Sequence, residues 1–152
     1  MNRNKHALLV KLIALMLIFA IISPLSVSAE ALEKSQTRAS DYLSSYNTYV
    51  CAMGSGKLQI WYTVVGMDDM DEIGVLSIKL YESTDQTNWT RVKTYSHENY
   101  SSMLAEDDFF HSSYVSYNGT AGKYYKAYVC IWAGRNGSGD TRYMWTPVER
   151  AT

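Results

Sequence analysis

Apolar and polar side chains alternate residue by residue through several segments of this chain. In an extended strand, successive side chains point to opposite faces, so this alternation is produced by a sheet with one buried face and one wet face. In residues 57–65 the apolar parity carries Leu58, Ile60, Tyr62 and Val64. The same pattern recurs with Leu76, Ile78 and Leu80 in residues 74–83, and with Tyr125, Ala127, Val129 and Ile131 in residues 123–133.

Segments rich in Val, Ile, Thr, Tyr and Trp predict seven strands in all. We expect them at residues 46–53, 57–65, 74–83, 88–96, 113–118, 123–133 and 140–146. Glycine and asparagine between the runs supply the positive φ of tight turns. Two longer connections, 66–73 and 97–112, lack a convincing period, although either has room for a short helix. This number and spacing of strands predict an all-β, immunoglobulin-like or fibronectin-III-like sandwich of antiparallel strands over residues 42–148.

The first 29 residues have the composition of a cleaved export signal. Arg3, Lys5 and Lys11 precede an unbroken apolar run, and small residues end the segment at Ala29. The run is shorter than the roughly 20 residues that a membrane-spanning helix needs. We therefore expect a secreted, extracellular protein without a stable membrane anchor after cleavage. A flexible tether (30–41) then precedes the domain, and a short tail (149–152) follows it.

The expected mature chain is mildly acidic. All 15 acidic residues of the chain and 11 of its 14 basic residues follow Ala29, which gives a net charge of 11 − 15 = −4. A protein that binds nucleic acid needs a basic surface, so this negative net charge argues against nucleic acid as the partner.

Two cysteines remain after the leader, Cys51 and Cys130. An even count in an exported chain suggests a disulfide between them, while two unpaired thiols remain the alternative. A redox role is not expected, because the spacing is unlike Cys-x-x-Cys.

Four acidic residues, Asp68, Asp69, Asp71 and Glu72, lie within five positions. They offer oxygen ligands of the kind that calcium takes, but not the order of an EF-hand loop. An acidic solvated turn is the simpler interpretation, and a calcium site is a weak alternative. No other cofactor is expected.

Nothing in the sequence favours catalysis. The expected mature chain has two histidines, His97 and His111, both in the long connection 97–112, and it has no nucleophile elbow and no His-Glu-x-x-His. We expect a protein that is not an enzyme. Residues 83–89 are similar to an Asp-box turn, with Asp85 placed to bond its own backbone and Trp89 placed to cover a hairpin.

Aromatic residues are the most informative feature for function. Residues 30–152 contain 13 Tyr, 4 Trp and 2 Phe, more than a small core can bury. Several fall on the polar parity of their strands. The candidate binding face consists of Trp61, Tyr81, Tyr124, Tyr128 and Trp132. Such rings grip a sugar or a protein surface, or they merely brace the sheet as cross-strand pairs.

Four stretches, 39–46, 70–74, 120–127 and 132–134, resemble a family of small secreted bacterial proteins of unknown function, mainly from Gram-positive gut and soil organisms. The likeness covers most of residues 39–146, and Tyr125-x-Ala127-x-Val129 resembles the sixth strand of fibronectin type III and immunoglobulin modules. The resemblance implies export and a sandwich fold, with no assigned activity. We therefore expect a secreted, non-catalytic module that binds a protein or cell-surface partner, with carbohydrate binding through exposed Tyr and Trp as the alternative.

Overall fold

The computed structural model describes residues 40–152, which form an all-β domain with one 3-10 turn, η1 (Ser101–Met103). The strands are β1 (Leu43–Gly54), β2 (Lys57–Ser83), β3 (Thr90–Ser96), β4 (Leu104–Asn118), β5 (Tyr124–Arg135), β6 (Ser138–Trp145) and β7 (Glu149–Arg150). The predicted signal peptide and tether residues 30–39 lie outside the described residues. Among residues 40–152 no helix is long and apolar enough to cross a membrane.

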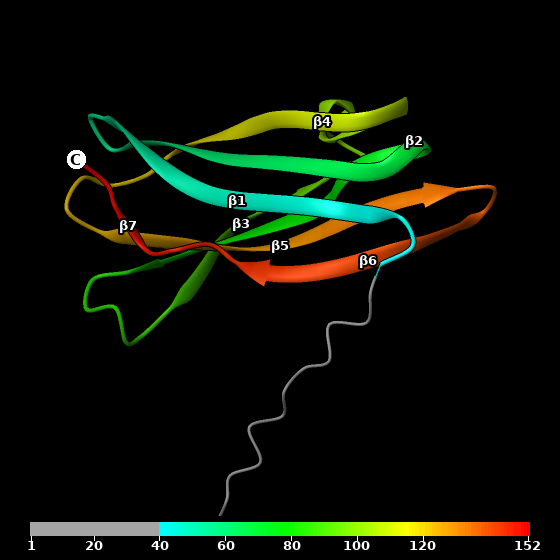
Figure 1. Cartoon of the computed structure of the whole chain (residues 1–152). Coiled ribbons are helices and arrows are strands. Elements are labelled where there is room, and N and C mark those ends of the chain that lie inside the picture. Colours follow the sequence, from blue (N-terminus) through cyan, green and yellow to red (C-terminus); the bar gives the residue numbers. More distant parts are fainter. Residues whose placement is uncertain (1–39) are drawn as a thin grey trace, which may run out of the picture. The chain divides into compact units, whose positions relative to one another are not determined.

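All strands belong to one antiparallel sheet that curls into two layers, and β2 is central to both (Figure 1). The first part of β2, residues 57–65, pairs with β1 on one side and β4 on the other. Its last part pairs with β5, through residues 72–83, and with β3, through residues 77–82. Because β6 pairs with β5, the first layer is β1–β2–β4 and the second is β3–β2–β5–β6.

The core lies between the layers, where the predicted apolar parities meet. Leu58, Ile60, Tyr62 and Val64 of the first layer are buried, as are Tyr125, Ala127, Val129 and Ile131 of the second. At about 25 cal/mol per Å² of buried apolar area, such side chains contribute roughly 1.5–3 kcal/mol each. The alternation in residues 57–65 and 123–133 is thus confirmed, and it explains why the sheet folds onto itself.

One phase of the alternation was predicted wrongly. Val75 is buried, whereas Leu76 is only partly covered. A register irregularity between Val75 and Ser77, opposite Ile131 and Cys130, inserts Leu76 as an extra residue. Such a bulge reverses which parity faces inward. Residues 73 and 75 therefore face the core before the bulge, and Ile78 and Leu80 face it afterwards.

The predicted connection at residues 66–73 is instead part of β2. A register irregularity between Val65 and Met70 marks the place where β2 leaves the first layer for the second. A side chain on Gly66 would lie 2.8 Å from the carbonyl oxygen of Asp68, so the bend requires a residue without one. Met70 is buried in the core, while the acids around it stay exposed. The acidic residues that were predicted to form a turn therefore lie on a solvent-exposed part of β2.

The second predicted connection, 97–112, is also mostly strand. After η1, β4 begins at Leu104 and first pairs with residues 70–74, then follows β2 along the first layer. Met103 of η1 is fully buried and covers the core between the two layers. The expected short helix is thus a single 3-10 turn.

The two ends of the described segment, residues 40–152, also form contacts that were not predicted. Residues 149–152 were expected to be a tail, but β7 pairs with β5, Ala151 is buried, and the N–H of Gly56 donates to the carbonyl oxygen of Thr152 at 2.8 Å. At the other end, the N–H of Leu43 donates to Oγ of Ser40 at 2.6 Å. Hydrogen bonds of backbone groups thus hold residues 151 and 152 against the layers and close the turn that precedes β1.

Candidate binding faces

The predicted aromatic face does not form one surface. Trp61 follows the outward parity of the first layer, opposite Tyr49 on β1 and Tyr114 on β4. Tyr81 belongs to the second layer, where Lys126 is its partner on β5. Tyr124, Tyr128 and Trp132 share the outward parity of β5, because the residues of the opposite parity, Tyr125 to Ile131, are buried in the core. Parity assigns a face within a layer, but not the layer itself.

On the outside of the second layer, four rings form a continuous row across β2, β5 and β6. The Tyr128 ring centroid lies 5.7 Å from that of Tyr143, nearly parallel, and 4.9 Å from that of Trp145. The Trp145 ring lies 5.2 Å from Tyr81. Tyr143 and Trp145 are 61% and 47% exposed, so much of this row faces solvent. We call the outward residues Tyr81, Trp89, Lys126, Tyr128, Tyr143 and Trp145 the aromatic face.

A cation stands between two indoles at one end of the aromatic face. Nζ of Lys126 lies 4.2 Å from the ring centroid of Trp89 and 4.6 Å from that of Trp145. Both distances are within the range at which an ammonium is attracted to an aromatic ring. The ammonium is therefore held in a defined place rather than left free on a flexible stem.

Trp89 is positioned by the turn between β2 and β3. The Asp85 carboxylate accepts the N–H groups of Thr87 and Asn88, at 2.9 and 2.8 Å. These bonds, the one from Asn88 first, hold the pKa of Asp85 well below its usual value. The Trp89 indole N–H donates to the carbonyl oxygen of Gln86 at 3.0 Å, which fixes the ring. The predicted self-bonded hairpin turn is confirmed.

Cations outnumber acids around the aromatic face. In register, Lys79 lies opposite Tyr128, and Arg91 lies opposite Tyr81. The guanidinium of Arg150 lies 5.8 Å from the ring of Tyr124, farther along the same side of β5. Within the described residues, the outward-facing positions of β2, β5 and β6 between the pair Tyr81–Lys126 and the pair Cys130–Tyr143 contain no Asp or Glu. Outside that stretch the same pairings contain three acids: Glu82 opposite Tyr125, Asp140 opposite Ala133 and Glu72 opposite Gly134.

Trp132 lies apart from this row and covers two glycines. A side chain on Gly134 or Gly139 would lie 2.5 Å from its ring. Its indole nitrogen is buried and has no hydrogen-bond partner among the described residues. The ring is packed against backbone, so Trp132 serves the sheet rather than extending the aromatic face.

The outside of the first layer carries a shorter row. The rings of Trp61 and Tyr114 lie 4.6 Å apart, and Tyr49 is the register partner of Trp61 on the other side. Around them are hydroxyls, such as Thr63 and Ser112, whose oxygens are 3.0 Å apart. This row contains rings without an ammonium between them.

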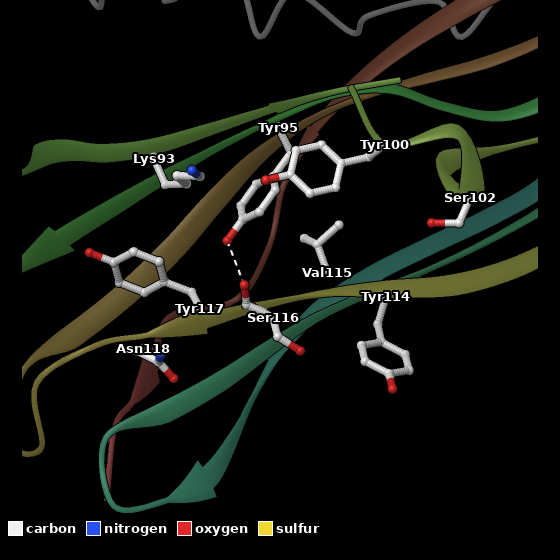
Figure 2. A pocket seen from close by; sticks show the side chains of 9 residues that line it. All are labelled: Lys93, Tyr95, Tyr100, Ser102, Tyr114, Val115, Ser116, Tyr117 and Asn118. Carbon is white, nitrogen blue, oxygen red and sulfur yellow. Dashed lines mark hydrogen bonds between the residues drawn. The ribbon is translucent and has the colours of Figure 1, made fainter. Parts of the chain in front are cut away.

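An open groove of about 510 Å³ lies where β3 and β4, the free edges of the two layers, face each other (Figure 2). The hydroxyl of Tyr95 donates to the carbonyl oxygen of Ser116 at 2.7 Å and joins the layers. Burial raises the pKa of Tyr95 to about 12. Figure 2 shows Val115 pointing into the groove and Tyr114 pointing away from it. The groove is lined mainly by neutral side chains, with Lys93 at its rim.

The disulfide prediction is wrong for this structure. Both cysteines are free, with Cys130 buried and Cys51 partly covered. Cys51 lies between the inward-facing Val50 and Ala52 on β1, and Cys130 lies between buried neighbours on β5. The two thiols therefore point outward from different layers, away from each other. Burial raises the pKa of Cys130 and keeps it in the thiol form.

The acidic residues at the bend do not gather around one point. Asp68 accepts a hydrogen bond from Nη1 of Arg135 at 2.8 Å, and Asp71 accepts the N–H of Asn136 at 2.7 Å. Among residues 40–152, no group of three or more His, Cys, Asp and Glu side chains is arranged to hold a metal ion. Asp69 and Glu72 complete the predicted set, which thus has no geometric support.

His111 forms a hydrogen bond with the backbone. Nε2 of His111 lies 3.0 Å from the carbonyl oxygen of Ser102, and its ring packs 5.8 Å from that of Tyr62. A carbonyl oxygen only accepts, so Nε2 is the donor in this hydrogen bond. His97 continues the pairing of β3 with β2 inside the second layer, because its backbone N–H donates to the carbonyl oxygen of Leu76 at 3.1 Å.

Four members of the aromatic face, Trp89, Lys126, Tyr143 and Trp145, were not among the binding residues predicted from the sequence. A signal was present for two of them, because Thr141, Tyr143 and Trp145 share one parity of a predicted strand. The partner strand could not be known, so the row that they form with Tyr128 was hidden.

Comparisons with known proteins do not place the chain in a family. No protein-family model and no curated protein matches its sequence. A crystal structure of a protein from Archaeoglobus fulgidus aligns with 72% of this chain and 98% of its own, with 6% sequence identity and a TM-score of 0.34. A similarity this low supports no inference about fold or function.

Proposed function

We propose that this protein is a secreted, non-catalytic binding module that attaches to a cell-surface partner through its aromatic face. The observation that carries the proposal is the row of exposed rings around the fixed ammonium of Lys126. Large, rigid, amphipathic rings dominate binding energetics, because they offer area at a low cost in side-chain entropy. A sheet that needed only bracing would not require exposed rings beside a lysine, Lys126, that forms no ion pair with a carboxylate within residues 40–152.

We further propose that the fold is immunoglobulin-like or fibronectin-III-like. The support is the division of strands, with three in one layer and four in the other, and the crossing of successive strands between layers. Loops at the ends of such sandwiches, and their outer faces, are the surfaces that bind partners. Export and membership of the Gram-positive secreted family belong to the same proposal, and they rest on the leader and on the quoted sequence stretches.

Retention on cell surfaces tests the function. Fluorescently labelled protein is incubated with intact Gram-positive and Gram-negative bacteria, and bound fluorescence is measured after washing. We expect retention that falls at least about tenfold in Trp145→Ala, which corresponds to about 1.4 kcal/mol. Tyr114→Ala is the matched control, because Tyr114 is similarly exposed on the first layer, at 44%. Equal loss or equal retention in the two variants would contradict the role of the aromatic face.

Carbohydrate is the second candidate partner, and one observation favours it. Lys126 separates two indoles that both face solvent in part, which creates two flat apolar platforms with a polar group between them. A sugar ring offers the complementary pattern, with apolar C–H faces and polar substituents at its rim.

A further inference from the structure

We propose that the aromatic face binds an acidic polysaccharide, one whose sugar units carry carboxylate groups. This inference rests on the proposed function and names the ligand chemistry for the same surface. The argument uses the position of one ammonium, the distribution of charge and the shape of the face.

The ammonium of Lys126 is placed to receive a carboxylate. It lies between the rings of Trp89 and Trp145, 4.2 and 4.6 Å from their centroids, and no carboxylate in the described structure forms an ion pair with it. A uronic acid unit lying against either indole brings its carboxylate, which projects from the ring edge, toward this cation. A charge-assisted hydrogen bond then forms beside an apolar contact, and each strengthens the other by excluding water.

The charges around the aromatic face complement an extended anion. Lys79, Arg91 and Arg150 lie on or beside the same side of the second layer as Lys126, without an acid in the register between Tyr81 and Tyr143. This concentration occurs in a chain whose expected mature charge is −4, so it is a local feature rather than a general basicity. Opposed charge patterns steer an anionic ligand to one surface of an otherwise acidic molecule.

The shape of the face favours a polysaccharide over other polyanions. The Trp145 ring is tilted by 57° from that of Tyr81 and by 43° from that of Tyr128, while Tyr128 and Tyr143 are nearly parallel, so the row as a whole is faceted rather than one continuous stack. Single-stranded nucleic acid binds where successive bases stack on open rings in a groove with many cations. An acidic polypeptide would use the cations but has little to place on the indoles. Sugar rings use both.

Three polymers separate these explanations. Binding of the protein to polygalacturonate, to its fully methyl-esterified form and to poly-glutamate is measured by isothermal titration calorimetry at low and moderate salt. We expect polygalacturonate to bind at least about tenfold more tightly than either of the others, because only it offers both sugar faces and carboxylates. Its affinity should fall as salt rises, since partly exposed charges are screened.

Variants tie that binding to the aromatic face. Lys126→Gln should weaken polygalacturonate binding about tenfold and reduce its salt dependence, while Trp145→Ala should weaken it without reducing that dependence. Lys57→Gln and Tyr114→Ala are matched controls, because both residues are exposed on the first layer. Circular dichroism of each variant checks that the sheet is intact, and Lys126→Gln keeps the test valid if Trp145→Ala misfolds.

The outcomes distinguish this inference from the proposed function. Equal binding of the esterified and acidic polymers overturns the acidic preference, although Trp145 would still govern cell retention. Tighter binding of poly-glutamate overturns the choice of a polysaccharide and favours an acidic protein partner. Binding that is unchanged in Lys126→Gln overturns the inference. If both Trp145→Ala and Lys126→Gln are retained on cells as well as the unmodified protein, the proposed function itself is overturned.

Discussion

The two outer surfaces of this sandwich are built by the same rule and have different contents. Each carries a cross-strand row of aromatic rings on the parity that faces away from the core. The first layer surrounds Trp61 and Tyr114 with hydroxyls, whereas the second surrounds Tyr128 and Trp145 with cations. Cross-strand pairing alone accounts for the first row. The added charge on the second row is what points to a ligand.

The largest stability effect should come from the end of the second layer that does not belong to the aromatic face. Gly139→Ala places a methyl group 2.5 Å from the Trp132 ring and 2.6 Å from the carbonyl oxygen of Ala133. We expect a loss of about 1–3 kcal/mol in the free energy of unfolding, because neither group can move away without disturbing the sheet. Urea unfolding measures it, with the exposed Ser138→Ala as control. A neutral Gly139→Ala would show that Trp132 is loosely packed.

Removing one ring from each surface sharpens the comparison next. Trp145→Ala loses ring contacts with Tyr81 and Tyr128 and the ammonium of Lys126, so about 1–2 kcal/mol of stability should be lost. Tyr114→Ala loses a single ring contact, with Trp61, and should cost about 1 kcal/mol. Chemical denaturation of both variants gives the difference. A larger loss in Tyr114→Ala would reverse the ranking of the two rows.

The cation contributes less to stability than the rings. Lys126→Met retains the apolar stem but removes the charge, and we expect a loss of about 0.5–1 kcal/mol in unfolding free energy. Lys57→Met, on the first layer, should change it by less than about 0.5 kcal/mol. If the two substitutions have the same effect, the ammonium of Lys126 is not held by its indoles.

Tyr95, at the open edges where the two layers meet, should make the stability depend on pH only in alkali and not near neutral pH. Tyr95 has a pKa raised to about 12 by burial, against about 10 in the unfolded chain. The raised value means that its contribution is complete below pH 10 and is lost as the pH rises through 12. Carbon-13 NMR of the tyrosine rings should show one resonance titrating last, which disappears in Tyr95→Phe. A Tyr95 resonance that titrates near pH 10, the usual value of a free tyrosine, would contradict its burial.

The sequence alone was sufficient to predict the buried residues where the apolar and polar side chains alternate without interruption. Leu58 to Val64 and Tyr125 to Ile131 are buried as expected, because a period of two has one solution when one face must avoid water. It was insufficient at Leu76, where a bulge shifts the phase without a distinctive residue. It was also insufficient at residues 104–112, where an edge strand exposes both sides and so lacks alternation.

The candidate site was predicted only in kind. Exposed aromatic residues were expected, and Tyr81 and Tyr128 do belong to the aromatic face. Trp61 was grouped with them because local periodicity does not reveal which strands become neighbours. Lys126 was overlooked for the same reason, since its meaning comes from Trp89 and Trp145, which are far from it in the sequence. Pairing across strands is a long-range property that a single segment does not contain.

The passage of β2 from one layer into the other has a consequence for how the domain is assembled. Both layers share strand β2, so neither layer is able to stay folded while the other unfolds. The domain should gain and lose its order as one cooperative unit. A backbone cut between Met67 and Asp68 would divide that shared ribbon, and the two fragments would have to find each other before either became structured.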